Sequence, residues 1–143
     1  MSARTSLRLA MAAVAVIAFA AAAAGISARA SYGAQLTADE PHYLLTAISL
    51  AEDGDLDVRD EFAAQRYRDF HEIDLAPQAR PLADGRLVEP HDPLLPLLLA
   101  VPMALGGWVA AKLALCLVAA ALAALTLWIA VRRLSVPVLP AAV

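Results

Sequence analysis

The sequence predicts an all-α membrane protein with two transmembrane helices, one short re-entrant or interfacial helix, and an external loop with amphipathic juxtamembrane helices. Hydrophobic residues make up 61% of the 143-residue chain, and its mean hydropathy is +0.64. In soluble domains only about half of the residues are apolar. All 14 acidic residues lie between Asp39 and Asp92, whereas residues 9–28 carry no charge and residues 94–131 carry only Lys112. A charged centre between apolar ends predicts two membrane segments that flank a polar loop.

The N-terminal segment, residues 1–30, is predicted to be a transmembrane helix. Residues 9–26 are all apolar or small. Their length is close to the minimum that crosses about 30 Å of hydrocarbon at about 1.5 Å per residue. A cleaved signal peptide is the alternative, because Ala28-Arg29-Ala30 fits a small-x-small cleavage site. Either interpretation places the next segment outside the cytoplasm.

The external acidic loop is predicted over residues 31–92. Thr37 can cap a helix, with Glu40 at the capping-box spacing, and Asp39 is an equally good cap, with Pro41 in the first turn. A second short helix is expected over residues 60–70. Both helices are expected to lie in the membrane interface on their apolar side chains: Leu44, Leu45, Ile48 and Ala51 in the first, and Phe62, Tyr67 and Phe70 in the second.

The stretch Asp53-Gly54-Asp55-Leu56-Asp57 ends the first helix and imitates the start of a calcium loop. An EF-hand needs Gly at the sixth position and Glu at the twelfth, where this chain has Val58 and Ala64. We therefore predict a turn here and assign no metal ligands. A divalent cation stays open as a cofactor of the acidic loop.

The chain is predicted to return to the membrane through an irregular, proline-rich covering loop over residues 73–93, with a turn at Asp84-Gly85. Residues 93–107 are apolar but too short to span, and they predict the re-entrant or interfacial helix, which Gly106-Gly107 ends. Residues 108–131 predict the second transmembrane helix. Its two tryptophans are about 30 Å apart along a helix, as two interfacial belts require.

The arginines predict the orientation. Arg4 and Arg8 precede the first span, and Arg132-Arg133 follow the second. The positive-inside rule then places both termini in the cytoplasm of a multi-pass cell-membrane protein and the loop outside. Residues 132–143 are expected to be a cytoplasmic tail that opens a further, truncated apolar segment.

Asp39 and Glu40 are the main candidates for chemistry. An aspartate at a helix N-terminus beside a membrane can accept a proton from an acceptor hydroxyl, and a second carboxylate can help hold a cation. The competing interpretation is that Asp39 only caps its helix.

Two further residues are weaker candidates. His91 lies where the loop returns to the membrane and can meet a lipid phosphate, although Asp92-Pro93 beside it also suits a helix cap. Lys112 can reach an anionic headgroup or extend to the interface. The other two histidines, His42 and His71, show no metal-binding spacing, and all three histidines are expected to lie singly at the surface.

Four motifs in this order resemble the N-terminal part of the GT-C superfamily of polytopic glycosyltransferases, which includes protein O-mannosyltransferases and the aminoarabinose transferases of lipid A. After the first membrane helix they are Ala38-Asp39-Glu40-Pro41-His42-Tyr43, then Ser49-Leu50-Ala51-Glu52-Asp53-Gly54-Asp55, then Pro90-His91-Asp92-Pro93-Leu94-Leu95-Pro96-Leu97, then Gly106-Gly107-Trp108 leading into a helix that ends Val131-Arg132-Arg133-Leu134. The resemblance covers nearly the whole chain.

The resemblance implies transfer of a sugar from a polyprenyl-phosphate donor to an external acceptor. It assigns Asp39 as the base or acceptor-orienting group, Glu40 as the second acid, and His91 as a replacement for a phosphate-contacting residue. Family members carry more spans, so we expect this chain to be an N-terminal fragment, inactive alone, with membrane lipid and a complementary fragment as partners. The alternative is a small non-enzymatic membrane protein whose acidic external loop binds a partner or a cation. The absence of a basic patch argues against a nucleic-acid partner.

Overall fold

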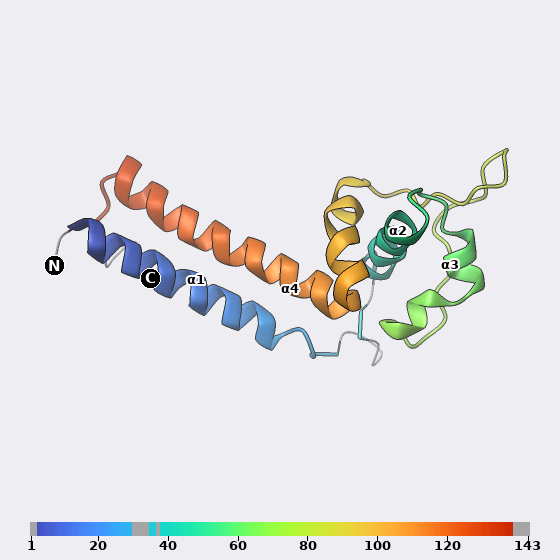
Figure 1. Ribbon diagram of the computed structural model, residues 1–143, viewed down its shortest axis with the longest axis horizontal. Helices are drawn as coiled ribbons and strands as arrows, with labels where there is room; N and C mark the ends of the chain where they lie inside the picture. The colour runs from blue at the N-terminus through green and yellow to red at the C-terminus, as the bar shows by residue number, and fades with distance from the viewer. Residues whose placement is uncertain (1–2, 30–34, 37, 139–143) are drawn as a thin grey trace. The chain divides into compact units, whose positions relative to one another are not determined.

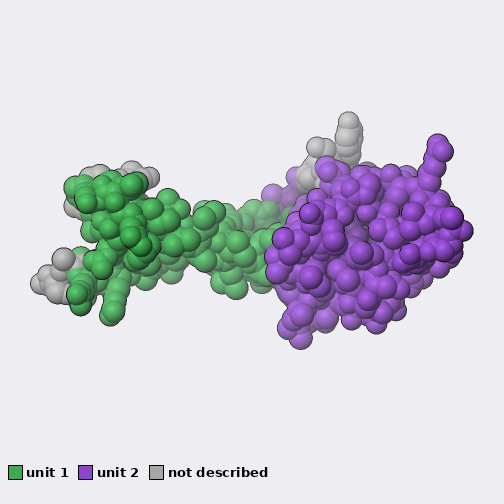
Figure 2. Space-filling view, turned by 90° about the horizontal axis from the view of Figure 1, so that it is seen from above, with its two compact units in different colours: residues 1–26, 112–143 green, residues 27–111 purple. Residues whose placement is uncertain are grey.

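A computed structural model describes residues 3–29, 35–36 and 38–138, and over these residues the protein is all-helical, with no strand. The chain divides into two compact units (Figure 2). The terminal unit comprises residues 1–26 and 112–143, and the central unit comprises residues 27–111. The elements in chain order are α1 (Ala3–Ala24), α2 (Glu40–Glu52), α3 (Arg59–Ala63), the 3-10 helix η2 (Arg66–Asp69) and α4 (Leu94–Arg133) (Figure 1).

The two long helices, α1 and α4, are each long and apolar enough to cross a membrane. Within the most apolar 18-residue stretch, only 6% of α1 and 17% of α4 is buried. A helix at the core of a soluble protein would instead be mostly enclosed. An N-terminal signal sequence meets the same criteria as α1, so the anchor and the signal both stay open. The orientation and the number of crossings stay predictions.

Helix α4 is interrupted where the sequence predicts a break. Gly106 has φ −162° and ψ 24°, and Gly107 has φ 63° and ψ −160°, so neither is helical. The second conformation is open almost only to glycine. The apolar piece before the break buries Pro96 and Leu99, whereas Leu97 is exposed. Its placement as a re-entrant or interfacial helix stays a prediction.

Helix α2 lies at the centre of the packed core of the central unit. It begins after Asp39 with Pro41 in its first turn, and it ends at Glu52. Gly54 follows with a positive φ of 77°, and its amide donates to the Ser49 carbonyl at 3.0 Å. Both boundaries agree with the sequence. The predicted single apolar face was wrong, because polar positions on other faces are buried too, including Thr46 and Ser49. A helix buried on several faces is a core element rather than an interfacial one.

The predicted helix over residues 60–70 was wrong as one element. Gln65 adopts a left-handed conformation, with φ 54°, and divides the segment into α3 and η2. The predicted interfacial anchoring of its aromatic residues was also wrong. Tyr67 and Phe70 are buried in the core beside α2, and Phe62 packs against that core. Removing large aromatic side chains from water stabilises the unit more than an exposed position would.

The covering loop is irregular, as predicted, and turns at Asp84-Gly85, where Gly85 has φ 86°. It is tied to the core by Leu87, whose carbonyl accepts the amide of Val58 at 2.9 Å. The end of the loop therefore returns to α2, where Glu89 lies beside His42.

Candidate functional site

The carboxylate of Asp39 is exposed at the start of α2. Its backbone carbonyl accepts the amides of His42 and Tyr43, both at 3.1 Å, as the first helical bonds require. Its side chain makes no capping hydrogen bond. Instead, the side-chain amide of Gln78 donates to Asp39 Oδ1 at 3.1 Å. The expected cap residue is therefore at the cap position, but its carboxylate is held by the covering loop. Thr37, the other predicted cap, lies outside the described residues.

His42, in the first turn of α2 after Asp39, forms a buried pair with Glu89. The residues are 2% and 5% exposed, and His42 Nδ1 lies 3.1 Å from Glu89 Oε1. Among the described residues neither of these two atoms has a partner in hydrogen-bonding geometry, so the contact is one of proximity and charge. It is an ion pair when His42 is protonated. The other Glu89 oxygen accepts the backbone amide of Gln78 at 3.3 Å, so Gln78 connects this pair to Asp39.

His91 extends this group of residues. Its ring lies 4.8 Å from the Tyr43 ring and 5.9 Å from the His42 ring, measured between centroids. His91 is half-buried, and its Nε2 has no hydrogen-bond partner among the described residues. The prediction of single surface histidines was wrong. His42 and His71 are buried, and His71 Nδ1 lies 2.6 Å from the Leu36 carbonyl oxygen.

An apolar cavity of about 320 Å³ adjoins this group at the start of α4. Asp92 lines it and caps the helix, because its Oδ1 accepts the Leu94 amide at 2.8 Å. The remaining lining residues are Tyr43, Leu94, Leu95 and Leu98. The volume is at the lower end of the range for small-molecule pockets, and the apolar walls suit part of a lipid.

Asp39, Gln78, Glu89, His42 and His91 form one set of residues in which each contacts the next. Of the four predicted site residues, Asp39 and His91 belong to this set. Glu40 follows Asp39 as the first residue of α2 and is half-buried. Lys112 belongs to the terminal unit, whereas the other three belong to the central unit.

No protein-family model, curated protein or solved structure matches this chain. The resemblance to GT-C glycosyltransferases therefore stays a prediction carried by the motifs alone.

The sequence did not single out two residues that build this set, Gln78 and Glu89. Both lie in the covering loop, far along the chain from the residues that they contact. Glu89 stands directly before the Pro90-His91 motif, and that position was the only signal that could have marked it. Gln78 carried no signal.

A second acidic cluster joins the end of α2 to the first turn of α3. One carboxylate oxygen from each of Asp53, Asp60 and Glu61 lies within 4.8 Å of the others. Glu61 is only 2% exposed, and its Oε2 has no partner among the described residues. Burial raises the pKa of the Glu61 carboxyl to about 8, and the charges of Asp60 and Asp53 add to that increase.

The predicted turn at residues 53–57 is confirmed. The Asp57 amide donates to Asp55 Oδ1 at 2.8 Å, and the Ser49 hydroxyl donates to the same oxygen at 3.1 Å. The Asp55 carboxylate is therefore used inside the turn, and the Asp57 carboxylate accepts the Leu87 amide at 2.8 Å. Asp53 instead faces the two acids of α3.

Proposed function

We propose that this chain supplies the acceptor-side acidic site of a membrane glycosyltransferase that moves a sugar from a polyprenyl-phosphate donor to an acceptor outside the cytoplasm. One observation carries the proposal: the Asp39 carboxylate is exposed and held by Gln78 rather than used to cap α2. A carboxylate in that state can accept a proton from a hydroxyl nucleophile.

The surroundings of Asp39 support a lipid-linked donor. The apolar cavity beside Tyr43 and Asp92 can take the first part of a polyprenyl chain. His91 lies against Tyr43 with an unpartnered, buried ring nitrogen, which can donate to a phosphate oxygen.

Each residue then has a stated role in the proposed transfer. Asp39 orients the acceptor hydroxyl and takes its proton, Glu40 is the second acid, and His91 contacts the donor phosphate. Lys112 is proposed to contact an anionic headgroup. Two candidate spans do not enclose a polyprenyl carrier, so further membrane segments, on the same protein or on a partner chain, are needed for catalysis.

The test measures transfer of labelled sugar from polyprenyl-phosphate donors in membranes that contain the complete enzyme. Asp39→Asn is expected to lower transfer by about 10²–10⁴-fold, as loss of a general base does. Asp69→Asn is the matched control, because Asp69 is an exposed aspartate on η2. Wild-type transfer by the Asp39→Asn protein would remove this residue from the mechanism.

A second candidate function is cation binding by the acidic loop, favoured by the cluster of Asp53, Asp60 and Glu61. Carboxylate oxygens are the ligands that Ca²⁺ and Mg²⁺ prefer. Glu61 is buried with one oxygen lacking a partner among the described residues, and its raised pKa reflects the cost of burying an unpaired carboxylate. A bound cation would take the place of the proton that otherwise neutralises this group. The three carboxylates would supply one side of such a site.

Calorimetric titration of the full chain in detergent micelles with CaCl₂ tests this candidate. Glu61→Gln keeps the shape of the side chain and is expected to abolish the binding heat. Asp74→Asn is the control, since Asp74 is an exposed acid that pairs with Arg68 outside the cluster. Equal binding by both variants would show that Ca²⁺ associates with the loop's general negative charge.

A further inference from the structure

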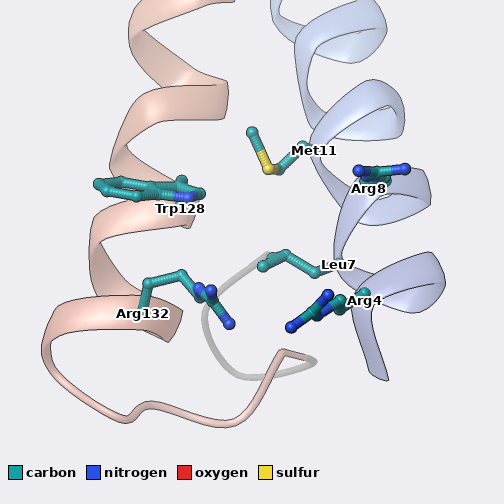
Figure 3. Close-up of a pocket in the computed structure, with 6 residues that line it drawn as sticks. All are labelled: Arg4, Leu7, Arg8, Met11, Trp128 and Arg132. Carbon is teal, nitrogen blue, oxygen red and sulfur yellow. The ribbon is translucent and has the colours of Figure 1, made fainter. Parts of the chain in front are cut away.

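Three arginines line one cavity in the terminal unit, where α1 begins and α4 ends (Figure 3). Arg4 and Arg8 come from α1 and Arg132 from α4, and the cavity volume is about 390 Å³. Figure 3 shows Arg4 and Arg132 extending toward one another from the two helices. The other lining residues are Leu7, Met11 and Trp128.

The spacing of these residues explains why they meet. Arg4 and Arg8 are four residues apart and therefore lie on one face of α1, and Trp128 and Arg132 share a face of α4 in the same way. Each helix thus presents charge at its end and apolar surface toward its middle. The Arg133 guanidinium also contacts Trp128, at 5.8 Å from its ring centroid.

The terminal unit contains no acidic side chain that could neutralise these arginines. All 14 Asp and Glu residues lie between Asp39 and Asp92, in the central unit. Among the described residues Arg4, Arg8 and Arg132 form no ion pair. All three are exposed, so water and salt screen their mutual repulsion. Arginine stays charged in proteins, so three guanidinium groups around one cavity still favour an anion between them.

We propose that this cavity binds the phosphate of an anionic phospholipid headgroup. The planar guanidinium fork bonds two phosphate oxygens at once, which makes arginine the side chain suited to such a ligand. Leu7, Met11 and Trp128 supply apolar walls for the glycerol and the first part of the acyl chains. A basic cavity at the end of two membrane-spanning helices is a recurrent form of anionic lipid site.

The test uses the full chain with Trp108→Phe, which leaves Trp128 as the single tryptophan and as a reporter inside the cavity. The protein in detergent micelles is titrated with short-chain phosphatidylglycerol, with short-chain phosphatidylcholine, and with inorganic phosphate. Phosphatidylglycerol is expected to change the Trp128 fluorescence saturably, and the other two probes only weakly. Equal affinity for phosphatidylcholine would overturn the proposal, and equal affinity for inorganic phosphate would overturn the assignment to a lipid.

Arg132→Gln and Arg4→Gln are each expected to weaken phosphatidylglycerol binding about tenfold or more, because each removes charge-assisted hydrogen bonds. Arg133→Gln is the matched control for charge, since it removes the same charge from the adjacent residue, which does not line the cavity. Because the Arg133 guanidinium contacts the reporter Trp128, this control is compared by the lipid retained in native mass spectrometry and not by fluorescence. Lipids that remain bound to each variant in native mass spectrometry give a second readout that does not depend on Trp128. An equal loss in the Arg132 and Arg133 variants would mean general attraction to a basic surface, and it would refute the site.

Discussion

Replacing Asp57 by alanine is expected to open the contact between the covering loop and the core of the central unit. Asp57 Oδ1 accepts the amide of Leu87 at 2.8 Å, although the two residues are far apart in the sequence. The adjacent Val58 amide donates to the Leu87 carbonyl at 2.9 Å. The side chain of Asp57 is 12% exposed, so most of this contact is shielded from water. Asp57 therefore holds the loop that carries the Gln78 and Glu89 contacts.

The expected magnitude follows from the single bond to Leu87. A hydrogen bond to a charged group contributes about 1.5–3 kcal/mol, and leaving a buried amide without an acceptor costs about 1–3 kcal/mol. These ranges describe the same interaction, so we expect Asp57→Ala to cost about 2 kcal/mol and Asp57→Asn about half as much. The pair with Arg59 adds little, because the arginine side chain is 56% exposed and water screens the charges.

Hydrogen exchange at the Leu87 amide, in the full chain in micelles, measures this local opening. A loss of about 2 kcal/mol corresponds to about 30-fold faster exchange. Asp84→Ala is a matched control, because Asp84 bonds the amide and side chain of Arg86 two residues later, as Asp57 does with Arg59. No bond from Asp84 to a distant segment is formed among the described residues. Unchanged exchange in the Asp57→Ala protein, or equally faster exchange in the Asp84→Ala protein, would refute the reasoning.

The same bonds give this contact a pH dependence. The hydrogen bond from the Arg59 side chain, followed by those from the backbone amides of Leu87 and Arg59, holds the pKa of Asp57 below its ordinary value of 3.8. A carboxyl with a lowered folded-state pKa stabilises the fold above its unfolded pKa, and that contribution disappears as the pH falls through the folded value. We therefore expect protection at Leu87 to stay constant from neutral pH down to about pH 4 and to fall only below it.

Three further substitutions test the core, the buried pair and the helix break. Phe70→Ala is expected to destabilise the central unit by about 3–5 kcal/mol in thermal unfolding, because the Phe70 side chain is only 1% exposed and nothing else fills its volume. Glu89→Gln is expected to cost about 1–3 kcal/mol by the same measurement, because it removes the charge beside buried His42. Gly107→Ala is expected to cost about 1–3 kcal/mol or to straighten α4, because a Cβ finds open space there but the backbone conformation is strained for alanine. A spin-label distance across the break distinguishes the last two results, and an unchanged stability and distance would contradict the role given to Gly107.

The sequence predicted the elements whose signals are local. Gly54 ends α2 and Gly106-Gly107 interrupts α4, and each of these boundaries depends on a backbone conformation that glycine adopts more easily than other residues. The two long apolar helices follow from composition and length alone. Features of this kind need no knowledge of what packs against the segment.

The candidate site could be predicted only in part, because its contacts join distant parts of the chain. Asp39 and His91 were recognisable from their motifs, but the buried partner of His42 is Glu89, and no local pattern indicates which carboxylate a folded chain brings to a histidine. Phe70 could not be placed from the sequence either, because its spacing from Phe62 and Tyr67 fits an interfacial helix as well as a buried core. The left-handed Gln65 redirects that segment into the core, and a glutamine gives no sequence signal for such a conformation.

The conformation of Asp39 shows how tertiary contacts decide between capping and chemistry. A capping side chain bonds amides of the first turn from a residue in the β region, but Asp39 has φ −83° and ψ −13°, after Ala38 with φ 56°. Its carboxylate is instead held by Gln78, from a loop that Leu87 and Asp57 attach to the core. Loss of a capping acid lowers helix stability directly, whereas loss of an exposed acid held by one amide removes few stabilising bonds. Asparagine caps a helix as well as aspartate does, so alanine is the informative replacement. An Asp39→Ala protein that keeps its stability but loses sugar transfer would therefore separate the two roles that the sequence alone left together.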